Sequence, residues 1–312
     1  MNQPKVSVCI PTYNYGRYIA EAIESVLCQS FADFEILVVD DASTDSTEEI
    51  LRSFAAQDSR VRYIRHEVNT GMVENWNYCL HEARGEYIKF LFADDYFESR
   101  ELLEQMVSIL DSDDSISLVG CARKFFNSTL GRSEILSLTD RNTLLNGTDV
   151  INYCLKSQQN SIGEPSAVMF RKQQALRGFD CRYRQLVDQE MWFHLLEQGR
   201  YYHFAEPLCA FRIHNEQQSA VNVKKSVILE DFLFLYDEYL SKPYITAGDL
   251  FKRYLWYDYY YKVWKSYSRH QRMSFSDFAA KVRNYGIVRL IVLYPAYRVY
   301  KTFLKVARKS RC

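Results

Sequence analysis

Two pairs of adjacent aspartates are the residues of this chain best suited to chemistry. Asp40 and Asp41 follow the apolar run 34–39, and Asp94 and Asp95 follow the run 87–92. Both runs have the β-branched and aromatic content of buried strands, which otherwise avoid adjacent charges. In an open α/β sheet, ligands bind beyond the carboxyl ends of the strands. Two acidic strand ends in one sheet therefore predict a nucleotide site and a metal site.

The elements that must position these carboxylates alternate between strand and helix. This order predicts an α/β fold, with a mostly parallel sheet flanked by helices. The predicted strands are 6–10, 34–39, 61–65, 86–92, 116–121, 165–170 and 208–213. The predicted helices are 18–28, 47–56, 73–83, 100–110 and 188–196, followed by a largely helical region from 224 to 312.

Composition narrows the class of protein. The chain has 312 residues, of which 47% are hydrophobic and 25% charged, as in globular proteins. A formal net charge of zero argues against a nucleic-acid partner. Eight cysteines lack zinc-site spacing, which predicts reduced thiols in a cytosolic protein. We expect neither a signal peptide nor a spanning helix, because no apolar run reaches about 18 residues.

The C-terminal stretch is basic, because nine lysines and arginines and no acidic residue follow Asp277. Aliphatic and aromatic residues are mixed with them, and Pro295 interrupts any single helix there. Such a segment is typical of peripheral contact with anionic lipid on the inner face of the cell membrane. A packed helical subdomain or an oligomer contact with a solvated basic face is the alternative.

The first strand ends in Pro11-Thr12-Tyr13-Asn14, without the glycine-rich loops of dinucleotide-binding or P-loop proteins. Together with 27–31, 39–45 and 83–88, this segment resembles the family 2 glycosyltransferases. These are nucleotide-diphospho-sugar transferases with the GT-A fold. The resemblance runs from about residue 5 to about residue 219, and it implies a GT-A catalytic domain over 1–220. Residues 1–100 would form the nucleotide-binding half, 101–220 the acceptor-binding half, and 221–312 a helical extension.

The resemblance implies a nucleotide site at the ends of the first two strands. Pro11 and Tyr13 match residues that line the base pocket, and Asp41 matches the aspartate that contacts uracil or another base. Asp40 is its neighbour on the same strand end, and Asp94 is expected on the ribose or on a water. Helix capping is the alternative for Asp40 and Asp41.

The resemblance also implies a divalent cation, Mn²⁺ or Mg²⁺, that offsets the charge of a diphosphate leaving group. Asp95 matches the metal-binding motif, and His214 matches a residue that reaches the metal or the diphosphate. Capping of the next helix and a structural histidine are the respective alternatives. Two positions depart from the family: Phe92 replaces a further aspartate, and Trp76 lies where many relatives carry Arg-Asn. We interpret Trp76 as core packing.

The acceptor side is implied by two further matches. The segment 186–192 resembles the Glu-Asp-x-Glu-Leu-Trp motif of the family, with Val187 in place of the first glutamate. Asp188 then matches the general base that takes the proton from the acceptor hydroxyl during inverting transfer. Glu164 lies in a segment near the acceptor in relatives and would bind acceptor hydroxyls or support the base. The alternatives are an N-cap for Asp188 and a strand-entry loop for Glu164.

These matches predict an inverting glycosyltransferase of the hexosyltransferase type. It would move a sugar from a nucleotide sugar, most simply a UDP-sugar, to a saccharide or lipid-linked acceptor. The implied setting is surface polysaccharide or lipopolysaccharide assembly. Two other classes of protein remain open. One is a non-catalytic nucleotide-sugar-binding subunit, because Phe92, Trp76 and Val187 depart from the family pattern. The other is a sugar nucleotidyltransferase, although the glycine-rich phosphate loop that it would need after the first strand is missing. Donor sugar and acceptor depend on pocket shape, which the motifs do not encode.

Overall fold

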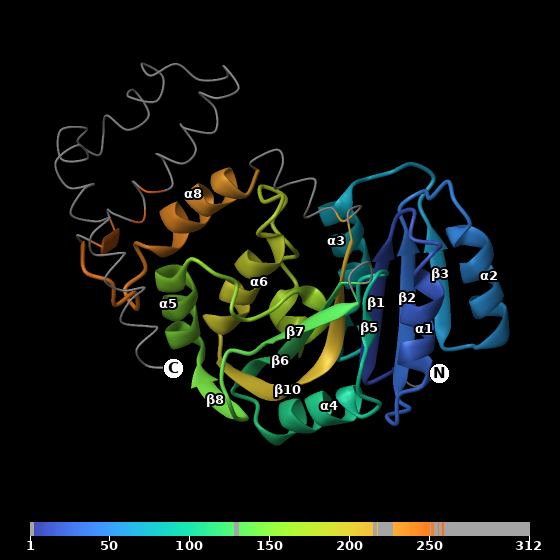
Figure 1. Ribbon diagram of the computed structural model, residues 1–312, viewed down its shortest axis with the longest axis horizontal. Helices are drawn as coiled ribbons and strands as arrows, with labels where there is room; N and C mark the ends of the chain where they lie inside the picture. The colour runs from blue at the N-terminus through green and yellow to red at the C-terminus, as the bar shows by residue number, and fades with distance from the viewer. Residues whose placement is uncertain are drawn as a thin grey trace, which may run out of the picture. The chain divides into compact units, whose positions relative to one another are not determined.

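The computed structural model describes residues 3–127, 131–214, 217, 227–249, 251–252, 255 and 258 (Figure 1). The chain divides into two units, Met1–Val221 and Asn222–Cys312. Strands and helices alternate in the first unit, whereas the described part of the second contains helix α8 (Val227–Tyr239). The division of the first unit into a nucleotide-binding and an acceptor-binding half stays a prediction.

The predicted contact with membrane lipid concerns a part of the chain that the structure does not describe. Within the described ranges, no helix has the length and apolarity needed to cross a bilayer. The basic stretch after Asp277 lies outside those ranges. Lipid contact and subdomain packing therefore both stay predictions.

One mixed sheet forms the centre of the first unit, with strand order β3-β2-β1-β4-β9-β6-β10-β5. Its parallel core strands are β1 (Val6–Thr12), β2 (Phe34–Asp40), β3 (Val61–Arg65) and β4 (Tyr87–Phe90). Strand β9 (Val168–Arg171) runs antiparallel between β4 and β6 (Ile116–Asn127), and β10 (Arg200–Ile213) is parallel to β6. The remaining strands are β5 (Tyr96–Phe97), β7 (Arg132–Leu136) and β8 (Thr143–Asn146). This arrangement confirms the predicted α/β class.

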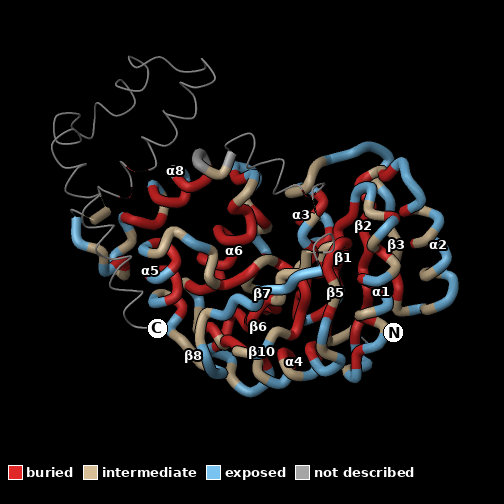
Figure 2. Tube along the Cα trace, viewed as in Figure 1, coloured by how far each residue is buried: buried red, intermediate tan, exposed pale blue. Residues whose placement is uncertain are grey.

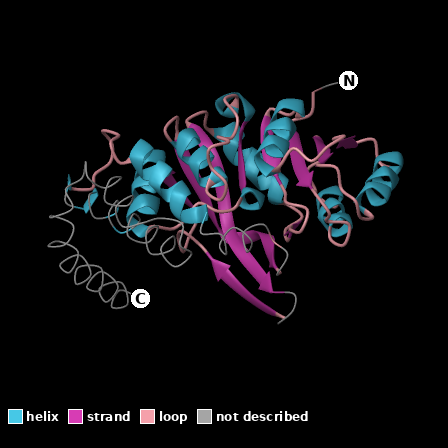
Figure 3. Cartoon of the chain, turned by 90° about the horizontal axis from the view of Figure 1, so that it is seen from above, coloured by secondary structure: helices cyan, strands magenta, loops and turns pink. Residues whose placement is uncertain are grey.

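The central strands are apolar along their whole length because both faces of the sheet are covered. Every residue of β1 and β2 is buried, as expected for parallel strands between helical layers. The helices that flank the sheet (Figures 1 and 3) are α1 (Ile19–Leu27), α2 (Thr47–Gln57), α3 (Met72–Glu82), α4 (Leu102–Ser112), α5 (Gly147–Ser157) and α6 (Val187–Leu196). Helix α1 shows the reason: Ile19, Ala22, Ile23 and Val26 share its buried face.

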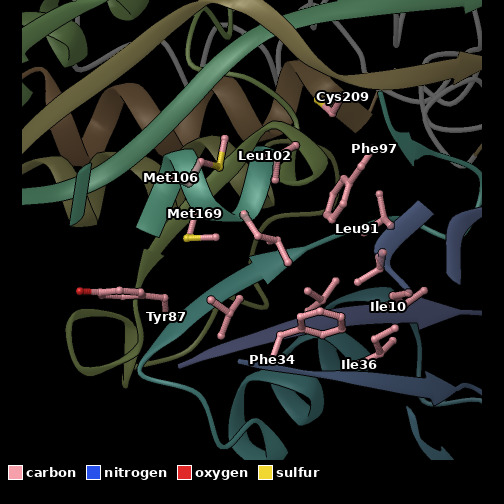
Figure 4. Close-up of a cluster of buried hydrophobic side chains, with 14 of the residues drawn as sticks. Ile10, Phe34, Ile36, Tyr87, Leu91, Phe97, Leu102, Met106, Met169 and Cys209 are labelled. Atoms are coloured by element: carbon pink, nitrogen blue, oxygen red, sulfur yellow. The ribbon is translucent and has the colours of Figure 1, made fainter. Parts of the chain in front are cut away.

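The hydrophobic core joins strands and helices that are distant in sequence. Ile10 of β1, Ile36 of β2 and Leu91, which directly follows β4, meet Leu102 and Met106 of α4 in one buried cluster (Figure 4). In Figure 2 strands β1 and β2 are red with buried residues, whereas most of α2 is exposed or partly exposed. The polar strand ends described below therefore rest on a closely packed apolar layer.

Two predicted strands differ from the structure. The segment 165–170 begins as a 3-10 turn, η1 (Pro165–Ala167), because Pro165 has no N–H and Ala167 N donates to Glu164 O at 2.8 Å instead. The strand predicted at 208–213 is the end of β10, which already begins at Arg200. Irregular register near Pro207 interrupts its alternation, which hides the first half from pattern analysis.

Candidate active site

Asp40 turns into the protein at the end of β2. Its side chain is fully buried. Oδ1 accepts hydrogen bonds from Ser43 N at 2.9 Å and from Ser43 Oγ, while Oδ2 lies 3.6 Å from Arg65 Nε. Asp40 therefore shapes the turn that presents Asp41. Its assignment as a nucleotide ligand stays a prediction, and the carboxylate has no exposed surface in this structure.

Asp41 directly follows β2, is only 3% exposed, and accepts hydrogen bonds from the two residues that precede α3. Oδ1 accepts from Thr70 N at 2.7 Å and Thr70 Oγ1 at 2.9 Å, and Oδ2 accepts from Gly71 N at 2.9 Å. A carboxylate has about four acceptor positions, so these three bonds leave room for roughly one more donor. An N–H of a base could take that position, which keeps the predicted base contact chemically possible.

The loops after β1 and β2 are joined to each other by hydrogen bonds. Asn14 Oδ1 accepts from Thr44 N at 2.8 Å, and Ser43 Oγ accepts from Asn14 N at 2.8 Å. Asp45 Oδ2 accepts from Gly16 N at 3.0 Å. The two loops therefore form one rigid rim at the carboxyl edge of the sheet.

Pro11 and Tyr13 have different environments on that rim. Pro11 is buried within β1 and pairs in register with Val39, whereas the Tyr13 side chain is 44% exposed. An exposed ring can stack on a base, while Pro11 contributes shape only. Between them, the buried Thr12 Oγ1 has no hydrogen-bond partner among the described residues. The base-pocket roles stay predictions.

The second acidic strand end meets the end of β10. Asp94 Oδ2 lies 3.0 Å from His214 Nε2, across a sequence separation of 120 residues. Asp95 Oδ2 accepts from Ser166 Oγ at 2.6 Å, and Asp95 Oδ1 accepts from Arg212 N at 3.1 Å. The structure thus pairs Asp94 with His214, whereas the carboxylate of the adjacent Asp95 is held by Ser166 and by the backbone of Arg212. It also adds Ser166, a contact that the motifs did not indicate.

The chemistry of these side chains fits a hard divalent cation. Burial, and then the adjacent charge of Asp94, raise the pKa of Asp95 well above its usual range. A bound cation would relieve the repulsion between the two carboxylates, and carboxylate oxygens are the ligands that Mg²⁺ and Mn²⁺ prefer. No cluster of three or more potential ligands is preassembled among the described residues. Metal binding by Asp95 and His214 therefore stays a prediction.

The two departures from the family pattern pack on each other. The rings of Trp76 and Phe92 have centroids 5.0 Å apart, and Phe179 packs edge-on against Trp76 at 5.3 Å. Trp76 is only 6% exposed, so it is a core residue, as its sequence context predicted. An apolar pair therefore occupies the two positions where the family resemblance implied an aspartate and an Arg-Asn pair.

Asp188 is the second residue of α6. Leu186 is the N-cap, so the N-cap alternative for Asp188 is wrong. Its carboxylate is nine-tenths buried, and Oδ2 accepts from Asn160 Nδ2 at 3.0 Å. Burial, followed by the negative charge of Glu164, raises the pKa of Asp188 to about 7. A carboxyl group with that proton affinity is suited to general base catalysis near neutral pH.

Glu164 is engaged by a residue that sequence reasoning missed. Arg123 Nη1 donates to both carboxylate oxygens, at 3.0 and 2.8 Å. Arg123 lies in β6 and is only 7% exposed. Its signal in the sequence is a charge directly after the apolar strand 116–121. Glu164 and Ser166 belong to one short segment, so the base region and the acidic pair are structurally linked.

The chain is similar in sequence to known glycosyltransferases. The family model described as glycosyl transferase family 2 matches residues 7–175, which is more than half of the chain. The uncharacterized protein MT1568 of Mycobacterium tuberculosis (strain CDC 1551 / Oshkosh) is 35% identical over 206 residues, which are 62% of this chain and 62% of that protein. TuaG of Bacillus subtilis (strain 168), proposed by its name as a teichuronic acid biosynthesis glycosyltransferase, is 28% identical over 254 residues, 81% of this chain and 95% of TuaG.

Solved structures share the fold. TarS 1-349 of S. aureus in complex with UDP-GlcNAc gives a TM-score of 0.64 at 21% identity, covering 82% of this chain and 71% of that chain. The mannosyltransferase PcManGT from Pyrobaculum calidifontis, in complex with GDP-Man and Mn²⁺, gives 0.57 at 18% identity, covering 97% and 84%. The GT-A architecture is confirmed, and the non-catalytic and nucleotidyltransferase alternatives are set aside. This chain belongs to glycosyl transferase family 2 and is a glycosyltransferase, as its ordered motifs predicted.

Proposed function

We propose that this glycosyltransferase moves a sugar from a UDP-sugar to a hydroxyl group of a saccharide or lipid-linked saccharide, with inversion at the anomeric carbon. The observation that carries the proposal is the buried carboxyl of Asp188, whose pKa of about 7 suits a base. Glu164 pairs with Arg123, and Ser166 donates to Asp95. The short segment that carries both residues therefore links the region of Asp188 to Asp94 and Asp95. A base and a diphosphate-binding edge are the two parts that direct transfer needs.

In the proposed mechanism, Tyr13 stacks on the base and Asp41 accepts an N–H bond from it. Asp94, Asp95 and His214 would hold a divalent cation, which when bound offsets the charge of the departing diphosphate. Asp188 takes the proton of the acceptor hydroxyl. As that oxygen bonds to the anomeric carbon, the bond to the diphosphate oxygen breaks on the opposite face, so the configuration inverts.

The choice of nucleotide and setting follows from chemistry and from the relatives. A carboxylate at Asp41 can accept from the ring N–H of uracil or guanine. The ring nitrogen N3 of cytosine is itself an acceptor, so cytosine could donate only through its exocyclic amine. TarS binds UDP-GlcNAc and PcManGT binds GDP-Man, whose bases are uracil and guanine. TuaG is named for a cell-surface polymer. We place the enzyme at the cytoplasmic face of the membrane, where surface polysaccharides begin their assembly.

Calorimetric binding of UDP, GDP, CDP and dTDP, each with and without Mn²⁺, tests the donor site. We expect metal-dependent binding of UDP and at least about tenfold weaker binding of CDP. Preferential binding of CDP would contradict the proposed UDP-sugar donor. Failure of all four nucleotides to bind would refute the proposed donor class.

Inversion and acceptor class need a direct product analysis. Incubation with the preferred UDP-sugar and a panel of saccharide acceptors, followed by NMR of the new linkage, reports the anomeric configuration. A product with the configuration of the donor would contradict the role of Asp188 as the base of a single displacement.

A further inference from the structure

A hydrogen-bonded chain leads from Asp188 to the centre of β6. Asn160 Nδ2 donates to Asp188 Oδ2 at 3.0 Å, and Arg123 Nη2 donates to the backbone oxygen of Asn160 at 3.3 Å. Arg123 also makes the two bonds to Glu164 described above. One buried cation therefore pairs directly with Glu164 and is linked to Asp188 through Asn160, whose amide side chain contacts the candidate base.

The Asn160 amide group has a fixed orientation. Its Oδ1 accepts from Ile162 N at 3.2 Å and from Gly163 N at 3.0 Å. Gly163 has a φ of 133°, a backbone conformation that side chains other than glycine disfavour. Trp192 Nε1 of α6 donates to Gly163 O at 2.9 Å and so ties this turn to the helix of Asp188. Flipping the amide would lose both acceptor bonds, so Nδ2 stays directed at the base.

Other titratable groups also lie around α6, besides the ion pair of Arg123 and Glu164. Burial keeps His203 of β10 neutral near pH 7, because it lowers the pKa to about 4, and burial raises the pKa of Cys154 of α5 to about 11. Tyr201 of β10 donates to Ile162 O at 3.2 Å. Further charged or titratable groups on α6 and on the elements packed against it are Glu190 with Arg177, His194 near Gln174 O, Lys124 of β6 with Glu98, Lys172 on η2 (Lys172–Ala175), and the exposed Asp149 and Lys156 of α5.

We propose that Arg123 and Asn160 are positioning residues for Asp188. Arg123 neutralises Glu164 and holds the 160–163 turn, and Asn160 orients the Asp188 carboxylate and donates to it. Glu164 acts within this unit as the counter-charge of Arg123. The catalytic consequence rests on the proposed function, but the electrostatic coupling does not, because it concerns side chains that contact one another in the free protein.

The proposed coupling predicts that substituting the two members of the Arg123–Glu164 ion pair shifts the pKa of Asp188 in opposite directions. Arg123→Gln leaves the Glu164 charge uncompensated, so the pKa of Asp188 should rise by about one pH unit or more. Glu164→Gln leaves the Arg123 charge uncompensated, so the same pKa should fall by a similar amount. Asn160→Ala removes a donor to the charged form and should also raise it.

The readout is the titration of the Asp188 carboxyl carbon, followed by NMR in protein labelled with ¹³C-aspartate and assigned with Asp188→Asn. The matched control is Arg177→Gln, because Arg177 makes an equivalent two-pronged pair with Glu190 on the same helix, at 2.8 and 2.7 Å. Residues 188 and 190 lie about 200° apart around the helix, so the control should leave the titration unchanged.

Shifts in the same direction for Arg123→Gln and Glu164→Gln, or an equal shift in the control, would overturn the proposal. If Arg123→Gln does not fold, Glu164→Gln and Asn160→Ala still give opposite signs and decide the question. With active enzyme, the acid limb of the kcat/KM profile should move with the NMR titration. A coupled titration without sugar transfer would refute the proposed function alone.

Discussion

Replacing Asp188 with asparagine removes one ionisable proton from a buried site while keeping the shape of the side chain. The amide oxygen can still accept the bond from Asn160 Nδ2, which spans 3.0 Å in the wild type. Any pH dependence that disappears in the variant therefore reports the carboxyl group itself. This makes Asp188→Asn a test of both stability and catalysis.

The sign follows from the raised pKa. The folded protein holds the Asp188 proton up to about pH 7, whereas the unfolded chain releases it near 3.8. Between these values the native state binds more protons, so the contribution of this group to stability falls as pH rises. The difference in pKa amounts to about 4 kcal/mol once Asp188 is fully ionised. Between pH 5 and pH 8 the change should be about 3 kcal/mol.

Urea unfolding of wild type and Asp188→Asn at pH 5, 6, 7 and 8 measures this change. The free energy of unfolding of the variant, relative to wild type, should increase by about 3 kcal/mol across that range. A difference that stays constant with pH would show that Asp188 is ionised with an ordinary pKa, and the reasoning from burial would be refuted.

The same variant separates chemistry from binding. Loss of a general base should lower kcat by about 10²- to 10⁴-fold, while the Kd for UDP with Mn²⁺ should remain within about twofold, because Asp188 is assigned to the acceptor side. Wild-type kcat/KM should rise with pH up to about pH 7, following the pKa of Asp188. Retention of full turnover in the variant would remove Asp188 from the mechanism.

Three further predictions concern the site and its support. Asp95→Asn should weaken the Mn²⁺-dependent part of UDP binding by at least about tenfold in calorimetry, since it removes a carboxylate from the proposed metal-binding pair. An unchanged Mn²⁺ effect would contradict the metal assignment. Gly85→Ala should destabilise the protein by about 2 kcal/mol or more in thermal unfolding, because the added Cβ would lie 2.3 Å from Ser7 N. Gly248→Ala is the control, since a Cβ there meets nothing within 4 Å. Trp76→Ala should lower the free energy of unfolding by about 3 to 5 kcal/mol. Substitution of the partly exposed Tyr78 on the same helix by alanine should lower it clearly less. Equal losses would show that the packing of Trp76 on Phe92 is unimportant for stability.

Local sequence patterns were sufficient to predict the elements in which buried residues recur in a regular pattern. The runs that became β1 and β2 are continuous and apolar because both faces of these strands are covered, and that pattern is visible without any partner. The buried face of α1 follows from helical spacing alone. The segment that became η1 and the first half of β10 were missed, because a proline and an irregular ladder interrupt the alternation there.

Side-chain orientation at the site depended on the fold. The sequence marked Asp40 and Asp41 as a pair, but only the structure shows that Asp40 is fully buried and that Asp41 holds the start of α3. Both residues end the same strand, and alternation sends neighbouring side chains in different directions. Both side chains are buried, and the partners of each carboxylate depend on the loops packed around that strand end.

By itself, the sequence determined the α/β class, the family, and the residue types at each strand end, because these are recorded in local periodicity and in ordered motifs. Only the tertiary structure decided which of those residues meet. Asp94 and His214 are separated by 120 residues, and Arg123 and Glu164 by 41. The proton affinity of Asp188 was likewise decided by burial and by the charge of Glu164. Contacts and electrostatic environments of this kind arise from packing between distant segments, and no local pattern records them.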